Sequence, residues 1–128
     1  MPRLVLVLAL ALTVALAGAR SGRAAADNGA DLVVAAQRAY DLAAQKLDGG
    51  TGHAEEVYTW SGRLLDAQRA RLKGRALGAA FKDHLGRMTA VATRVTIQFE
   101  SGQTPSAEVA FASYYRLQAE GWAAAKRR

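Results

Sequence analysis

The stretch "FESGQTPSAEVAFASYY", residues 99–115, places a glycine, a threonine and a proline between two runs rich in alanine and aromatic residues. Gly102 is suited to end a helix, because glycine reaches the left-handed backbone of a helix C-terminus without steric cost. Thr104 is a favourable N-cap, and Pro105 is favourable at the first helical position, where its missing N–H is not needed. The stretch therefore predicts a turn between two helices rather than a catalytic loop.

Downstream of this turn, a helix is expected over residues 105–126. Phe111, Tyr115 and Trp122 share one face of it and are flanked by alanines. Aromatic residues at helical spacing usually pack against a neighbouring helix. We therefore expect this face to fold back against the preceding helix.

Upstream of the turn, one long helix is expected from about residue 54 to 101, because this segment contains no proline. An apolar heptad pattern passes through Trp60 and again through Phe81 and Phe99. The pattern fails around Gly74 and Gly78, and each glycine in a helix interior costs about 1 kcal/mol relative to alanine. The alternative is a four-helix bundle in which the long helix breaks near Gly74, and a sharp bend between residues 72 and 80 would favour it.

A first amphipathic helix is expected over residues 29–48, ended by Gly49 and Gly50. The predicted fold class is therefore all-α, with antiparallel helical hairpins: the long helix is flanked by two shorter ones in coiled-coil-like packing. The predicted packing seam consists of the aromatic residues Trp60, Phe81, Phe99, Phe111, Tyr115 and Trp122.

The N-terminus has the pattern of a secretory signal peptide. Arg3 precedes an apolar run from Leu4 to Ala17, and small residues follow at 17–19 and again at 24–26. We expect a signal peptide at residues 1–19, with residue 26 as an alternative end, and a single helical domain at 27–128. The apolar run is shorter than the roughly 17 to 25 residues that a membrane-spanning helix needs. The mature chain is thus expected to be periplasmic or secreted, without a stable membrane span.

Composition narrows the chemistry that the chain can perform. It has no cysteine, which excludes disulfides, thiolate metal sites and covalently attached c-type haem. The full chain carries a net charge of +6, with 17 basic and 11 acidic residues. A chain that begins at Asp27 loses Arg3, Arg20 and Arg23 and keeps an excess of +3. This small excess argues against nucleic acid as a partner.

Few residues suggest a reaction centre. His53 and His84 lie far apart, and Asp83 beside His84 points about 100° away on a helix, so no metal site is expected. We find no catalytic constellation, no cofactor motif and no evident small-molecule substrate. The one dense basic run, "RARLKGR", supplies candidate anion contacts at Arg69, Arg71, Lys73 and Arg75.

The segment "VTIQFESGQTPSAEVAFASYYRLQAE", residues 95–120, resembles the helical hairpin of TolC-like outer-membrane efflux proteins. Phe99, Gly102 and Glu108 occupy matching kinds of position, as do Val109 and the Ala-Glu pair at 119–120, and Glu108 stands where aspartate is commoner. The chain departs from the family pattern with Pro105 in place of a frequent serine and Ser101 in place of a usual alanine.

The resemblance covers about a fifth of the chain and implies the hairpin unit rather than transport. A TolC-like channel protomer is several times longer and supplies barrel strands, and this sequence has no alternating strand segments. The segments "AEEVYTWSGRLLDAQRARL" and "SYYRLQAEGW" are similar to small secreted bacterial helical proteins that have no established activity.

We therefore expect an exported bacterial envelope protein that works by helix-to-helix contact, with itself or with a protein partner, rather than by catalysis. The alternative is a basic helical module that binds anionic lipid, envelope polymer or nucleic acid through the basic run. A small periplasmic enzyme or ligand binder is the weaker third option, since it would need a deep pocket with convergent polar groups.

Overall fold

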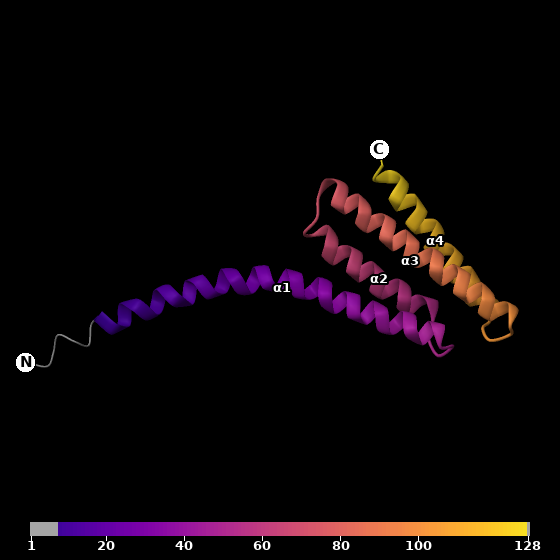
Figure 1. The fold of residues 1–128 in the computed structure, drawn as a ribbon, viewed down its shortest axis with the longest axis horizontal. Helices are drawn as coiled ribbons and strands as arrows, with labels where there is room; N and C mark the ends of the chain where they lie inside the picture. The colour runs from indigo at the N-terminus through magenta and orange to yellow at the C-terminus, as the bar shows by residue number, and fades with distance from the viewer. Residues whose placement is uncertain (1–7, 128) are drawn as a thin grey trace, which may run out of the picture. The chain divides into compact units, whose positions relative to one another are not determined.

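The computed structural model describes the backbone of residues 8–127 and the side chains of residues 28–127. This part of the chain forms four helices and no strand (Figure 1). The helices are α1 (Leu8–Asp48), α2 (Ala54–Arg69), α3 (Gly74–Glu100) and α4 (Ser106–Ala125). The predicted all-α fold is confirmed.

The chain divides into two compact units, one up to Asp31 and one from Leu32 onward. The described part of the first unit, residues 8–31, forms the N-terminal part of α1. The predicted start of this helix near residue 29 is therefore wrong. The sequence between Pro2 and Pro105 contains no proline that would stop a helix, and the segment is rich in alanine. The predicted signal peptide falls on residues that lie outside the described backbone or the described side chains, and it stays a prediction.

The predicted long helix over residues 54–101 is also wrong, because the chain turns back after Arg69. Gly74 adopts a positive φ of 58°, which L-residues with side chains rarely adopt. α2 and α3 then run antiparallel: Ser61 contacts His84, whereas Leu65, further along α2, packs with Phe81, earlier on α3. Folding back buries Leu65, which one long helix would leave without this partner. The structure thus has the break that the four-helix alternative places near Gly74.

A continuous hydrophobic core joins the four helices within the second unit. Its buried members come from the C-terminal part of α1 and from α2, α3 and α4: Ala43, Leu47, Ala54, Val57, Met88, Val91, Val95, Ala112 and Ala119. A smaller cluster of Leu65, Ala80 and Phe81 lies toward the α2–α3 turn. All the residues that α4 buries are alanines, which lets α4 approach α3 closely.

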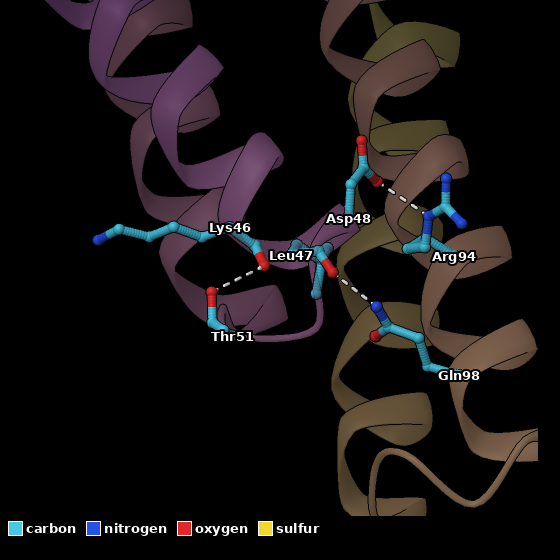
Figure 2. Close-up of polar contacts among 6 residues, drawn as sticks. All are labelled: Lys46, Leu47, Asp48, Thr51, Arg94 and Gln98. Atoms are coloured by element: carbon cyan, nitrogen blue, oxygen red, sulfur yellow. Dashed lines mark hydrogen bonds and ion pairs between the residues drawn. The ribbon is translucent and has the colours of Figure 1, made fainter.

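Polar contacts fix the C-terminal end of α1 on α3 (Figure 2). The Gln98 side-chain amide donates to the carbonyl of Leu47 at 2.6 Å, which satisfies one of the carbonyls left free at a helix end. Arg94 Nε pairs with Asp48 Oδ1 at 2.8 Å. Gly50, with φ of 79°, turns the chain after the helix as predicted.

The α3–α4 turn also ends its first helix as predicted. α3 ends at Glu100, and Gly102 follows in the left-handed region with φ of 73°. The start of α4 differs from the prediction by one residue: Pro105, not Thr104, is the N-cap residue, and Ser106 is the first helical one. Pro105 has an extended ψ of 158°, and its carbonyl accepts the first helical hydrogen bond, from the Glu108 N–H at 3.1 Å.

Candidate functional site

The residues predicted to form one aromatic seam lie in different environments. Phe81 is buried, whereas Trp60 and Tyr115 are half-buried. The other three, Phe99, Phe111 and Trp122, are exposed by 46%, 48% and 39%. The structure therefore places half of the predicted seam at the surface, where large apolar side chains are available to another molecule.

The fold-back of the last helix brings aromatic rings together on α2, α3 and α4. Tyr115 stacks on Tyr58, with ring centroids 4.0 Å apart and an angle of 8° between the ring planes. Trp122 stacks on His84, with ring centroids 5.7 Å apart. The Tyr58 hydroxyl donates to Gln118 Oε1 at 2.7 Å. These contacts fix the rotation of α4 about its own axis and so decide which of its faces is exposed.

The outward face of α4 carries an uncharged heptad stripe that the sequence analysis did not identify. Its six members repeat with alternating spacings of three and four residues, and all six are exposed: Ala107, Ala110, Tyr114, Leu117, Gly121 and Ala124. We call these residues the α4 outer stripe. Tyr114 and Leu117 are exposed by 61% and 57%. Such a pattern is typical of a helix that packs against a second helix.

The edges of the α4 outer stripe also carry few charges. The flanking positions are occupied by Ser106, Phe111, Ser113, Gln118, Glu120 and Ala125. Glu120 is the only charged residue among them, and it is paired with Arg116 on the same helix. A solvent-facing helix surface normally carries charged residues, so this composition makes the stripe a candidate interaction surface.

Glu108 has a structural role that the sequence did not predict. Its Oε2 accepts a hydrogen bond from the backbone N–H of Ala54, the first residue of α2, at 3.0 Å. His53, the N-cap residue of α2, offers no side-chain cap, and its Nδ1 lies 3.8 Å from the other Glu108 oxygen. A carboxylate at the positive end of a helix dipole is stabilising. Glu108 thus ties the start of α4 to the start of α2.

The basic run lies at the α2–α3 turn, and the structure brings the C-terminal end of α4 to the same end of the bundle (Figure 1). The Arg69 guanidinium lies 5.7 Å from the centroid of the Phe81 ring, and Lys126 Nζ lies 5.4 Å from it. Arg69 also pairs with Asp66 at 3.6 Å. Arg71, Lys73 and Arg75 are exposed around the turn. The candidate anion contacts are therefore gathered, with Lys126, at one end of the bundle.

A buried polar network connects α2 and α3. Ser61 and His84 are both fully buried, and Ser61 Oγ lies 2.8 Å from His84 Nδ1. Arg87 Nε donates to the same Oγ at 2.7 Å, which leaves the hydroxyl hydrogen of Ser61 to be donated to His84 Nδ1. The other ring nitrogen of His84, Nε2, is buried and makes no hydrogen bond within residues 28–127.

The surroundings of His84 hold its imidazole neutral. Burial, and then the positive charge of Arg87, lower the pKa of His84 from 6.5 to about 4. Burial also lowers the pKa of the Arg87 guanidinium, whose charge lies over the Tyr40 ring at 5.3 Å from its centroid. The serine–histidine pair has the contact that activates a nucleophile, but solvent does not reach either side chain. This network specifies how α2 and α3 pair.

The surface hollows that the structure shows are small or shallow. One of about 100 Å³ lies between α1, α2 and α3, with Tyr40, Arg87 and Arg94 among its lining residues. Another, at the α2 N-terminus, is lined by His53, Glu55 and Glu108 together with Glu56, Thr59 and Trp60. Among the described residues, no group of three or more metal-ligating side chains converges. No helix within the described part of the chain is both long and apolar enough to cross a membrane.

Comparisons with protein-family models, with curated proteins and with solved structures found no match.

Proposed function

We propose that the protein acts by helix-to-helix contact with another protein chain rather than by catalysis. The α4 outer stripe is the observation that carries this proposal, because it presents six uncharged heptad positions to solvent. Its central side chains, Tyr114 and Leu117, are among the most exposed large apolar residues described. Aromatic and aliphatic side chains of this kind are the usual anchors of protein interfaces.

The stripe also defines the kind of partner. It covers the 18 residues from Ala107 to Ala124, which lie about 26 Å apart at a rise of 1.5 Å per residue along a single helix face. The α4 outer stripe has no basic side chain that could bind a polyanion. The partner surface is thus an apolar helical stripe of similar length.

We propose that this contact forms in the bacterial envelope. The signal-peptide pattern at residues 1–19 supports export, and the resemblance of residues 95–120 to a TolC-like hairpin supports an envelope setting. The hairpin α3–α4 is the unit that carries the stripe. The protein would therefore be a small scaffold whose last helix is a docking element.

Site-specific photo-crosslinking in the cells that produce the protein tests the proposal. A photoreactive amino acid in place of Tyr114 or Leu117 should form adducts of defined size with a protein. The same amino acid in place of Leu42, which is exposed by 60% on α1, is the matched control. Adducts of equal yield from positions 117 and 42, or none from either stripe position, would contradict the assignment.

A second candidate function rests on the basic end of the bundle. Lys126 approaches the Phe81 ring that Arg69 also approaches, so two segments far apart in the sequence contribute cations to one surface. This surface would bind anionic lipid headgroups. Binding to vesicles containing phosphatidylglycerol should then fall steeply as salt rises, whereas apolar helix pairing should not. Lys73→Glu combined with Arg75→Glu should abolish it.

A further inference from the structure

We infer that the occupant of the α4 outer stripe is the same stripe of a second copy of this chain, packed antiparallel. This inference rests on the proposed helix-to-helix function and names its partner. Two observations carry it: the order of side chains along the stripe, and the separation of charge between the two ends of the bundle.

The stripe matches itself when it is reversed. An antiparallel coiled coil pairs each a position with a d position of the partner helix. Aligning Tyr114 with the second copy's Leu117 also aligns Ala110 with its Gly121 and Ala107 with its Ala124. The two large side chains then occupy the centre of the interface, and small residues face small residues at both ends. A two-fold axis requires this kind of self-complementary surface.

The charges at the two ends of the bundle favour the same orientation. We call the end that contains the α1–α2 and α3–α4 turns the acidic end. Around it lie five carboxylates and two cations, one of which, Arg94, pairs with Asp48: Asp48, Glu55, Glu56, Glu100, Glu108, Lys46 and Arg94. We call the opposite end the basic end. It has six cations and one carboxylate: Arg69, Arg71, Lys73, Arg75, Lys126, Arg127 and Asp66.

α4 runs from the acidic end to the basic end, so its orientation in a dimer decides which ends meet. Antiparallel packing sets the basic end of each copy beside the acidic end of the other. Parallel packing would bring the two basic ends together, and like charges juxtaposed at an interface are unfavourable. Antiparallel packing also opposes the two helix dipoles. The order of side chains along the stripe and the charges at the two ends of the bundle thus both favour antiparallel packing.

Disulfide mapping of the full chain tests the arrangement, because the protein has no cysteine of its own. The two single variants are Ala110→Cys and Gly121→Cys, and a side chain built at Gly121 would meet no atom within 4 Å. In the antiparallel dimer, residue 110 of one copy faces residue 121 of the other. Two copies of residue 110 are then separated by 11 residues, or about 16 Å along the helix. A disulfide needs Cα atoms within about 7 Å of each other.

Under mild oxidation, an equimolar mixture of the two variants should form a disulfide-linked heterodimer. Each variant alone should stay largely unlinked, and so should a mixture of Ala110→Cys with Leu42→Cys. Efficient linkage of each variant with itself would show a parallel pairing and overturn the inference. Absence of linkage in every mixture, with a monomer in sedimentation velocity, would overturn self-association. In that case, photo-adducts with another protein from position 114 would still uphold the proposed function.

Discussion

The buried histidine gives the bundle a pH-dependent stability that can be worked out in sign and size. His84 lies beside Arg87 with no solvent access, and its pKa is about 4 in the folded chain against 6.5 in an unfolded one. Between about pH 6.5 and pH 4, the unfolded chain therefore binds a proton on His84 that the folded chain does not bind. The stabilising contribution is fully present above about pH 6.5 and is lost progressively as the pH falls toward 4.

The size of the effect follows from the difference in pKa. One pKa unit corresponds to about 1.4 kcal/mol, so the full loss is about 3 kcal/mol. Between pH 7 and pH 5, the free energy of unfolding should fall by about 2 kcal/mol through His84 alone. This is a substantial share of the stability of a small domain.

Urea unfolding followed by circular dichroism at pH 7 and pH 5 measures this fall. His84→Gln provides the comparison, because glutamine does not titrate and His53 remains in both proteins. The wild-type chain should lose about 2 kcal/mol more than the variant between the two pH values. Equal losses in the two proteins would show that His84 is accessible to protons in the folded state and would refute the burial of the Ser61–His84 pair.

Three further substitutions test the fold by their effect on the free energy of unfolding in urea. Glu108→Ala should lower it by about 1 kcal/mol, because the α2 N-terminus loses its cap, and an unchanged value would contradict the contact with Ala54. Gly102→Ala should lower the free energy of unfolding by about 1 kcal/mol, because alanine is strained at a φ of 73°. Gly62 has no positive φ, so Gly62→Ala is the control and should not show this loss. Leu64→Ala should cost about 2 to 5 kcal/mol, because Leu64 is fully buried, and a cost below 1 kcal/mol would place it outside the core.

The helix ends marked by glycine could be predicted from the sequence because they depend on local backbone preference. Gly50 and Gly102 both follow helices and both adopt positive φ, as expected. Gly74 also adopts a positive φ, but it lies at the start of α3. A glycine inside a heptad pattern costs only about 1 kcal/mol, so the pattern did not decide between a break and a continuous helix. The packing of Leu65 on Phe81 after the fold-back favours the break.

The contacts between distant residues could not be predicted in the same way. Ser61 meets His84 only because α2 and α3 form a hairpin, and Glu108 reaches Ala54 only because two helix ends lie together. The exposed face of α4 was missed for a different reason. Aromatic residues suggest a buried face, yet α4 buries a stripe of alanines and leaves Phe111 and Trp122 exposed. Close helix packing favours the smaller side chains.

The most direct test of the account compares two leucines of similar exposure, Leu117 on the α4 outer stripe and Leu42 on α1. Each is replaced by glutamate in the full chain, and the size of the complex is measured by chemical crosslinking in the cells that produce the protein. Leu117→Glu should abolish the crosslinked complex, because the replacement buries a charge in an apolar contact, while Leu42→Glu should leave it intact. A complex that survives Leu117→Glu, or that is lost equally in both variants, would contradict helix-to-helix contact through α4.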